Sequence, residues 1–448
     1  MFDAWRADGR EVAVIGLGRS GDAASRLLRA HGVAVYASDA GQGSALDITA
    51  AALRAMGVAV DLGHHDLARI GRAQAAILSP GVPPEAPPVR AARAAGIPVR
   101  AEVDLGLEAM AGLPYVATTG TNGKSTVTAL VAHLLQAAGH AAEAVGNIGT
   151  PLCEVALRAA PPAWLSLEIS SFQLHDCPRV HPAAGILTNL APDHLDRYAT
   201  LAEYYADKRR LFANATGASV WVSNADNPDS QQLMAGVPGQ HRRFSVEARA
   251  DAWLDREANV LRLGTVALLP RADLPLLGDH NVANALAAAL AVGACGVAPE
   301  AIAAGLRTFG GLSHRLEPVG TVGGVAWIND SKATNVASTT VALAAMQQPF
   351  VLLLGGRHKG EPYTSLRPLL KGRARAVLAY GESAPLVMAD LGDLAERVDG
   401  PLETVLERAA AVARPGDAVL LSPACSSYDM FRNYEERGQQ FRAWVEAR

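Results

Sequence analysis

The sequence predicts an α/β protein of three domains, with a Rossmann-like domain at each end and a mostly parallel sheet in the central domain. Short apolar runs typical of buried strands alternate with helical segments along the 448 residues, a pattern that favours parallel sheets covered by helices. Glycine-rich turns follow two of these strands, and the length suits two to four domains. We expect the domains to occupy residues 1–112, 113–311 and 312–448.

The composition excludes several classes of protein. Half of the residues are apolar, and the formal net charge is −4, from 40 basic and 44 acidic side chains. No basic block is interleaved with aromatic residues, which argues against a nucleic-acid partner. There is neither an apolar run of membrane-spanning length nor a signal-peptide pattern. The four scattered cysteines are best interpreted as reduced thiols. We expect a cytoplasmic protein without a membrane span, and a monomer.

The first glycine-rich turn contains Gly16, Gly18 and Gly21 in GxGxxG spacing, and the following strand ends near Asp39. This order of strand, turn, helix, strand and acid is typical of sites that bind a diphosphate-bearing nucleotide. A tight turn that only packs a helix on a strand is the alternative. A rigid loop at residues 79–84 follows another strand, at the sheet edge where ligands bind in open α/β sheets. In this region we expect strands at 11–15, 33–37 and 74–78, a helix at 22–30, and a domain boundary at 101–114.

The second glycine-rich turn lies between a strand at 115–118 and a helix at 126–138, and it ends in Gly123-Lys124-Ser125. The N–H groups of such a loop and the positive end of the helix both suit a phosphate. The lysine adds a charge for the β- and γ-phosphates, and the serine offers a hydroxyl to Mg²⁺. The usual motif has glycine where this chain has Thr118. A chance lysine in a glycine-rich turn is the alternative.

Ionisable residues follow two further strands of the central region. Glu168 is the single charged residue of the apolar run 164–171. A buried carboxylate is costly unless it is paired or binds a metal, so it is either a Mg²⁺ ligand or a hydrogen-bonded structural acid. His194, flanked by Asp193 and Asp196, comes after a strand at 184–190. Lys208 lies in a helix, where spacing alone predicts a solvated charge.

Further along the chain, we expect a hairpin at 256–269 and an Ala/Leu-rich helix capped by residues 278–284. A second boundary is expected at 310–315. Functional groups again follow strands in the last region, which favours another parallel sheet. Those strands are expected at 325–328, 350–354, 376–380 and 418–421.

Several motifs together resemble the Mur ligase family, the ATP-dependent amide ligases of peptidoglycan synthesis. The phosphate loop at 119–125, Asn147 in a Gly-Asn-Ile-Gly segment, Glu168 with Ser170-Ser171, and Asp193-His194 fall in the order of that family. The segments 329–335 and 422–427 are most similar to the members that add D-glutamate. The resemblance covers essentially the whole chain. One departure is Ala40-Gly41 after Asp39, where the family would have a hydroxyl and an arginine.

The resemblance implies that ATP activates the carboxylate of UDP-N-acetylmuramoyl-L-alanine as an acyl phosphate, which the amine of D-glutamate then attacks. It implies two Mg²⁺ ions and four catalytic residues, Lys124, Glu168, His194 and Lys208, of which Lys208 fits a Tyr-x-x-x-Lys spacing from Tyr204 and would be carbamylated. The metal ligands would be Ser125, Glu168, His194 and, if carbamylated, Lys208. ATP would be bound by Thr118, Thr119, Gly120, Thr121, Asn122, Gly123, Lys124, Ser125, Thr126, Asn281, Arg315 and Asp330.

The same resemblance implies two groups of substrate-binding residues. The UDP-linked sugar acid would be bound by Gly18, Arg19, Ser20, Asp39, Ser79, Gly81, Asn147, Ser170, Gln173 and His194. D-Glutamate would be bound by Lys332, Thr334, Lys359, Ser427, Tyr428 and Tyr434.

Three other functions stay open at this point. A nicotinamide-dependent dehydrogenase would use the first glycine-rich turn, but it would leave Lys124, Glu168 and His194 without a role. A folylpolyglutamate synthetase shares the phosphate loop and its chemistry, but it does not account for a GxGxxG domain ahead of that loop. A nucleotide-binding switch without ligase activity is the third alternative.

Overall fold

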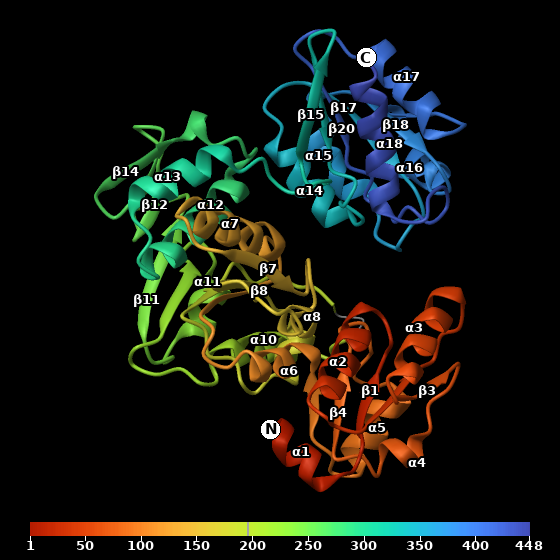
Figure 1. Cartoon of the computed structure of the whole chain (residues 1–448). Coiled ribbons are helices and arrows are strands. Elements are labelled where there is room, and N and C mark those ends of the chain that lie inside the picture. Colours follow the sequence, from red (N-terminus) through yellow and green to blue (C-terminus); the bar gives the residue numbers. More distant parts are fainter. Residues whose placement is uncertain (195–196) are drawn as a thin grey trace. The chain divides into compact units, whose positions relative to one another are not determined.

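The computed structural model describes residues 1–194 and 197–448. The chain forms two compact units (Figure 1). The first contains residues 1–274 and 282–308, and the second contains residues 275–281 and 309–448. The first unit carries two β-sheets and the second carries one, which together confirm the predicted α/β class. No described helix is long and apolar enough to cross a bilayer.

The N-terminal sheet has the strand order β3-β2-β1-β4-β5, and all of its pairings are parallel. The order reverses between β1 and β4, so a crevice opens beyond the ends of these two strands, where ligands bind in such sheets. Its elements are α1 (Phe2–Asp8), β1 (Val12–Ile15), α2 (Arg19–Ala30), β2 (Val35–Asp39), α3 (Ser44–Ala55), β3 (Ala59–Leu62), α4 (Leu67–Ile70), β4 (Ala75–Leu78), α5 (Pro87–Ala94) and β5 (Val99–Ala101).

The central sheet has the order β14-β13-β12-β11-β10-β9-β6-β8-β7. It is parallel from β7 to β12, whereas β12, β13 and β14 pair antiparallel, which confirms the predicted hairpin. Its strands are β6 (Tyr115–Thr119), β7 (Ala142–Gly146), β8 (Trp164–Glu168), β9 (Ala184–Leu187), β10 (Val220–Asn224), β11 (Gln240–Ser245), β12 (Ala252–Asp255), β13 (Val260–Leu263) and β14 (Val266–Pro270). Its helices are α7 (Lys124–Ala137), α8 (Leu152–Ala156), α9 (Ser171–His175), α10 (Leu201–Arg209), α11 (Pro228–Met234), α12 (Asp279–Ala294) and α13 (Pro299–Thr308), with 3₁₀ turns at Arg210–Phe212 and Arg271–Asp273.

The segment predicted as the first domain boundary is largely a helix, α6 (Glu102–Ala109). Leu105 on this helix belongs to the core of the N-terminal sheet, whereas Val103 and Leu107 belong to the core of the central sheet. A helix with apolar groups on more than one side can be buried between two layers. The two sheets of the first unit are therefore joined by a shared packed helix.

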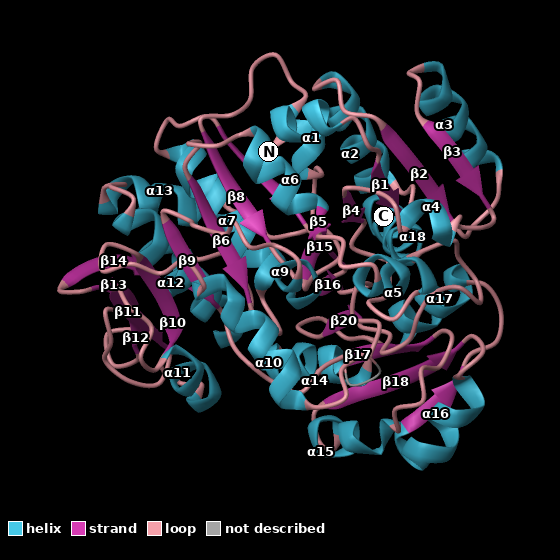
Figure 2. Ribbon diagram, turned by 90° about the horizontal axis from the view of Figure 1, so that it is seen from below, coloured by secondary structure: helices cyan, strands magenta, loops and turns pink. Residues whose placement is uncertain are grey.

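The sheet of the second unit has the order β15-β16-β20-β17-β18-β19, and only its β15–β16 edge is antiparallel. Helices α14, α15 and α16 cover one face, and α17 and α18 cover the other (Figure 2). Its elements are β15 (Glu317–Val322), β16 (Val325–Asn329), α14 (Val336–Ala345), β17 (Phe350–Gly355), α15 (Arg367–Leu370), β18 (Ala374–Tyr380), α16 (Ala384–Leu391), β19 (Ala395–Arg397), α17 (Leu402–Val412), β20 (Ala418–Leu421) and α18 (Tyr434–Glu446), with 3₁₀ turns at Tyr363–Leu366 and Gly392–Leu394.

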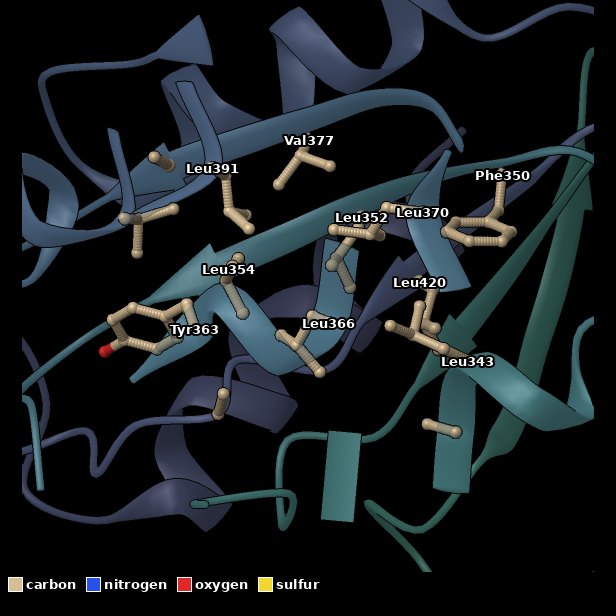
Figure 3. Packing of buried hydrophobic residues seen from close by; sticks show 14 of the residues in the cluster. Leu343, Phe350, Leu352, Leu354, Tyr363, Leu366, Leu370, Val377, Leu391 and Leu420 are labelled. Carbon is tan, nitrogen blue, oxygen red and sulfur yellow. The ribbon is translucent and has the colours of Figure 1, made fainter. Parts of the chain in front are cut away.

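The continuous apolar run of β17 explains why this strand lies inside the sheet. Phe350, Leu352 and Leu354 point to one face, where Leu343 and Leu420 pack with them (Figure 3). The intervening side chains belong to the core on the other face. A strand buried on both faces needs apolar residues at every position, as parallel sheets do.

Several element boundaries differ from the sequence prediction, and three of them change where polar residues lie. Helix α2 begins at Arg19 rather than at residue 22, immediately after Gly18. Strand β2 covers residues 35–39 rather than 33–37, so Asp39 is its last residue. Strand β9 ends at Leu187, so Thr188 and Asn189 lie beyond the strand. In all three cases the observed boundary places polar residues at the carboxyl edge of a sheet.

Candidate active site

The phosphate loop connects β6 to α7, and its two glycines have backbone angles that L side chains rarely adopt. Gly120 has φ 145° and Gly123 has φ 82°. A Cβ atom at Gly120 would lie 2.0 Å from the hydroxyl of Thr188, and one at Gly123 would lie 2.4 Å from Oδ1 of Asn284. Both positions therefore require glycine. Thr118, which replaces the usual first glycine, is a buried residue within β6 and does not need glycine geometry.

Two lysine side chains reach this loop. Nζ of Lys124 donates to the carbonyls of Gly120 (3.0 Å) and Thr121 (2.8 Å). Nζ of Lys208, on α10, donates to the same Gly120 carbonyl at 2.6 Å and lies 4.5 Å from the centre of the Tyr204 ring. Burial, followed by the nearby charge of Lys124, lowers the pKa of Lys208 well below its usual value. The Lys208 amine is thereby shifted toward its neutral form, which contradicts the solvated charge that spacing alone predicted.

Glu168 lies beside the phosphate loop because β6 and β8 pair in a register that sets it opposite Thr118. The side chain is buried, with 1% of its surface exposed. Its Oε1 accepts a hydrogen bond from Nδ2 of Asn147 at 2.8 Å, whereas Oε2 has no hydrogen-bond partner among the described residues. A buried, unpartnered carboxylate oxygen suits a hard cation, because Mg²⁺ binds through one or two carboxylates and keeps the rest of its shell for phosphate and water. The site therefore fits Mg²⁺.

His194 has a left-handed backbone, with φ 54°. Its ring lies 5.1 Å from the centre of Phe172 and 6.0 Å from that of Tyr204, both edge-on. Its Nε2 lies 3.6 Å from a carboxylate oxygen of Asp193. Asp196, the second acid predicted to flank this histidine, lies outside the described residues. Sequence reasoning pointed to the histidine but not to the aromatic rings around it.

The glycine-rich loop of the N-terminal sheet is closed by side chains from two neighbouring strands. The Asp39 carboxylate accepts from the backbone N–H of Leu17 (2.6 Å) and of Gly41 (2.7 Å). The Ser79 hydroxyl donates to the carbonyl of Gly16 at 2.8 Å. The structure therefore brings together the predicted residues Asp39 and Ser79 at the switch point of the sheet. Of the other predicted residues in these two loops, Gly18 and Gly81 are exposed and Ser20 is half-buried.

The segment between β7 and α8 connects this loop to Glu168. Asn147 holds the Glu168 carboxylate, and the carbonyl of Gly149 accepts from the guanidinium of Arg19 at 3.2 Å. The same guanidinium pairs with Glu154 at 3.1 Å. The predicted residues Arg19 and Asn147 therefore lie on one continuous path between the two glycine loops of the first unit.

A cavity of about 370 Å³ lies within the first unit, and this volume is typical of a small-molecule site. Its walls include Leu78, Ser79 and Pro80 from the N-terminal sheet, and Phe172, Gln173 and Tyr198 from the central region. Nε2 of Gln173 is buried without a hydrogen-bond partner among the described residues. The neighbouring Ser170 caps α9 in a reciprocal box with Gln173, which fixes both residues.

In the second unit, polar residues gather after β16 and β20. Asp330 is buried and accepts from the hydroxyl of Ser422 (2.8 Å) and the backbone N–H of Leu316 (3.2 Å). Burial raises the pKa of Asp330 to about 7. The fully buried Arg437, on α18, donates to Ser331 and to the carbonyl of Cys425. This guanidinium ties the two loops together, and sequence reasoning missed it because a single arginine in a polar helix carries no signal.

The residues predicted to bind D-glutamate all belong to the second unit. Nζ of Lys332 donates to the Tyr434 hydroxyl at 2.9 Å, and Nζ of Lys359 donates to the Thr334 hydroxyl at 3.3 Å. The structure thus brings four of the predicted residues together in two cation–hydroxyl pairs. Of the other residues predicted to bind D-glutamate, Ser427 is buried and Tyr428 is 64% exposed. Two residues predicted to bind ATP make local contacts. The side-chain amide of Asn281 donates to the Leu277 carbonyl at 2.9 Å, and the backbone N–H of Arg315 donates to the Leu312 carbonyl at 3.2 Å.

Two further residues near the phosphate loop were absent from the prediction. The amide oxygen of Asn189 accepts from the backbone N–H of Asn122 at 3.0 Å, and Asn284 lies against Gly123. The polar Thr-Asn pair that follows the apolar residues of β9 is the signal that would have identified Asn189. Asn284 lies within an apolar helix, and its polar side chain was the only indication that it has a role near the loop.

Family models match three consecutive parts of the chain. A Mur ligase MurD-like N-terminal domain matches residues 10–101, a Mur ligase middle domain matches 118–292, and a Mur ligase glutamate ligase domain matches 314–425. A UDP-N-acetylmuramoylalanine–D-glutamate ligase of Anaeromyxobacter dehalogenans is 45% identical over 97% of both chains. The chain belongs to the Mur ligase family. Members of this family are ATP-dependent amide ligases.

Other relatives of this Mur ligase carry the same description. A UDP-N-acetylmuramoylalanine–D-glutamate ligase of Myxococcus xanthus is 40% identical over 98% of both chains. Among solved structures, a UDP-N-acetylmuramate–alanine ligase of Thermotoga maritima shares the fold, with a TM-score of 0.61 and 19% identity over 98% of this chain and 99% of the other. A bifunctional folylpolyglutamate synthase/dihydrofolate synthase of Yersinia pestis also shares the fold, with a TM-score of 0.56 and 16% identity over 77% of this chain and 92% of the other.

Proposed function

We propose that this Mur ligase joins D-glutamate to UDP-N-acetylmuramoyl-L-alanine, with ATP as the energy source, in peptidoglycan precursor synthesis. Near-full-length similarity to ligases of that description supports the substrates. The structural observation that carries the proposal is the buried Glu168 beside the phosphate loop, with one carboxylate oxygen unpartnered among the described residues. A nucleotide switch would also hold Mg²⁺ with a carboxylate beside its phosphate loop, so the near-full-length similarity to ligases is what favours a ligase over a switch.

The chemistry requires activation of a carboxylate, because its carbon is electron-rich and oxide is a poor leaving group. Transfer of the γ-phosphoryl group of ATP gives an acyl phosphate, whose carbonyl the D-glutamate amine attacks, and the tetrahedral intermediate then releases phosphate. The protein contributes mainly positioning and charge stabilisation. In this proposal Lys124 contacts the β- and γ-phosphates, and the loop from Thr118 to Thr126 surrounds them.

The metal-binding roles divide between two sets of side chains. Ser125 and Glu168 would hold one Mg²⁺, and His194 with a carbamylated Lys208 would hold a second. Bound Mg²⁺ would neutralise charge on the transferring phosphoryl group and bring it to the acceptor carboxylate. Glu168 is in turn held by Asn147, which fixes the direction of its free oxygen.

The buried amine of Lys208 supports the carbamate. A neutral amine adds to CO₂ and releases one proton, which turns a cation into an anionic oxygen ligand suited to Mg²⁺. The lowered pKa of Lys208 favours the reactive neutral form. Lys208→Ala should be inactive and should regain activity with small carboxylates such as acetate. A variant that stays inactive with every small carboxylate would contradict the carbamate.

The dianionic D-glutamate requires two anion-binding groups. Lys332 and Lys359, each bonded to a hydroxyl of the second unit, would supply the cations. Thr334, Ser427, Tyr428 and Tyr434 would complete the site. Lys359→Ala should raise the KM for D-glutamate about ten-fold, as the loss of one charge-assisted contact would. An unchanged KM would contradict the role of this lysine.

The remaining assignments follow the two other substrates. Asn281, Arg315 and Asp330 would bind the adenosine and phosphates of ATP. The sugar nucleotide would contact Gly18, Arg19, Ser20, Asp39, Ser79 and Gly81 with its diphosphate and uridine, and Asn147, Ser170, Gln173 and His194 with its sugar acid. Ala40 and Gly41 lack the side chains that the family would present there, so uracil contacts would come from elsewhere. We also propose domain limits near residues 112 and 311, a monomer, and a cytoplasmic location.

One assay tests the function directly. Phosphate release is measured with ATP, Mg²⁺ and UDP-N-acetylmuramoyl-L-alanine while amino acids of both hands are compared. Release should depend on D-glutamate and on the sugar acid. Hydrolysis that is independent of both would favour the nucleotide switch, and an NADH fluorescence change on titration would favour a dehydrogenase.

A further inference from the structure

The side chain of Tyr198 is held at both ends beside the proposed metal ligand His194. Its ring stacks on Phe172, with centroids 5.4 Å apart and planes within 10°. Its hydroxyl donates to Oδ2 of Asp207 at 3.0 Å. Its backbone N–H donates to the carbonyl of His194 at 3.1 Å. The position of Tyr198 is therefore connected directly to the backbone of the histidine.

Asp207 is itself fixed from the other side. This carboxylate is buried, and its Oδ1 meets Nδ1 of His175 at 2.8 Å and accepts from Nε of Arg210 at 3.0 Å. Both oxygens of the carboxylate thus have partners, and the group lies on α10 immediately before Lys208. A carboxylate held by several donors has little freedom to follow a tyrosine that moves, so it acts as a rigid anchor.

His194 needs such an anchor because its backbone is strained. A left-handed φ of 54° in a residue with a side chain is unfavourable and persists only where the surrounding contacts hold it in place. The rings of Phe172 and Tyr204 contact the imidazole edge-on, and Phe172 is in turn held by its stack with Tyr198. Loss of the hydrogen bond between the Tyr198 hydroxyl and Asp207 would therefore loosen both the Phe172 ring and the His194 backbone.

We infer that Asp207 is a positioning residue, which holds the Tyr198 side chain so that the Phe172 ring and the hydrogen bond from the Tyr198 N–H to the His194 carbonyl keep the imidazole in place. The inference rests on the proposed function of His194 as a ligand. Asp207 itself touches no reacting group. Its contribution reaches the imidazole through the hydrogen bond to the Tyr198 hydroxyl, the stack of Tyr198 on Phe172, and the backbone hydrogen bond from Tyr198 to His194.

The experiment compares Tyr198→Phe, Asp207→Ala and the double variant with Arg210→Gln as matched control. Arg210 bonds to the same carboxylate but not to the tyrosine, and its side chain is half-exposed, so its ion pair contributes little. Without it, Asp207 keeps its contacts with His175 and Tyr198. Tyr198→Phe keeps the ring and removes one hydroxyl. We expect kcat to fall about ten-fold to a hundred-fold in the first two variants, because small displacements of reacting groups have effects of that size. The KM for D-glutamate should stay within about two-fold.

Two readouts distinguish positioning from simple destabilisation. With histidine-selective ¹⁵N labelling, the His194 imidazole resonance, assigned by its loss in His194→Asn, should move in Tyr198→Phe and Asp207→Ala in metal-free protein, and should stay in place in Arg210→Gln. The double variant should lose no more activity than Asp207→Ala alone, since coupled residues are not additive. Wild-type kcat and an unmoved His194 resonance in Tyr198→Phe would overturn the inference. Failure of the wild-type protein to ligate D-glutamate would instead contradict the proposed function, while the resonance still tests the anchor.

Discussion

The two glycine-rich loops of the first unit share one backbone plan and differ in charge. Both connect a buried strand to the start of a helix, and both contain glycines with positive φ. In the N-terminal loop the carboxylate of Asp39 accepts two of the loop's N–H groups. In the central loop two lysine amines reach the same carbonyl of Gly120. A carboxylate makes the first loop less attractive to a highly charged anion, and the charge of Lys124 makes the second more so.

The comparison shows that the turn alone does not select the ligand. A strand–loop–helix turn offers N–H groups and a helix dipole to any phosphate. The neighbouring strands then add the charges, Asp39 from β2 in one case and Glu168 from β8 in the other. We therefore assign the triphosphate and its metal to the central loop and the diphosphate of the sugar nucleotide to the N-terminal loop.

The largest expected effect comes from the charge of the central loop. Lys124→Ala should lower kcat about a thousand-fold, because it removes a cation aimed at the charge that develops on the transferring phosphoryl group. Phosphate release measures this loss. Lys371→Ala, which removes an exposed lysine of the second unit, is the matched control and should behave like the wild type. Equal activity of the two variants would remove the main difference between the loops.

Glu168→Gln should lower kcat about a hundred-fold and raise the Mg²⁺ concentration that gives half-maximal rate. The amide keeps an acceptor for Asn147 but loses the negative charge that would bind the cation. Rates are measured at fixed Mg²⁺–ATP while free Mg²⁺ is varied. An unchanged Mg²⁺ dependence would mean that the free carboxylate oxygen has a structural role only.

Asp39→Ala tests the N-terminal loop. The change leaves the backbone N–H groups of Leu17 and Gly41 without their acceptor, so the loop should lose its shape. We expect the KM for UDP-N-acetylmuramoyl-L-alanine to rise about ten-fold while kcat stays within two-fold. Steady-state kinetics with that substrate as the variable measure both. A loss of kcat at unchanged KM would place Asp39 in the chemistry rather than in binding.

The smallest expected effect concerns the stability of the protein, and it comes from Lys208, which contacts the central loop rather than the N-terminal loop. The folded-state pKa of Lys208 lies below the unfolded value of 10.5, so the unfolded chain binds a proton that the folded chain does not. The free energy of unfolding should therefore rise with pH up to about pH 10.5. In carbonate-free buffer, Lys208→Met should flatten the rise in Tm between about pH 7 and 9 by a few degrees. A slope equal to that of the wild type would mean that the amine is not buried.

Much of the fold could be predicted from sequence because buried parallel strands are continuous apolar runs. The strand at 418–421 was predicted with the boundaries it has, whereas α2 begins before its predicted start. Contacts between distant segments were beyond prediction, since neither Arg437 nor Asp207 belongs to a recognisable pattern. The roles of the predicted site residues remain predictions until the variants are measured.

One signal in the composition was available and would have pointed to Lys208. The 40 basic residues include only five lysines, at positions 124, 208, 332, 359 and 371. Where arginine serves almost every solvated position, a lysine stands out as a site where a compact or deprotonatable amine is required. Four of the five are residues to which we assign roles, and the fifth supplies the control variant.

The short connection from Asn147 to Gly149 has a consequence for how the two substrates communicate. The Asn147 side-chain amide donates to the Glu168 carboxylate, and the Gly149 carbonyl accepts from the Arg19 guanidinium. A ligand that draws Arg19 toward its own phosphates would alter the support of Glu168, and by reciprocity an ion at Glu168 would alter the affinity for that ligand by the same factor. Cooperativity between sugar nucleotide and metal would then reside in the short segment from Asn147 to Gly149.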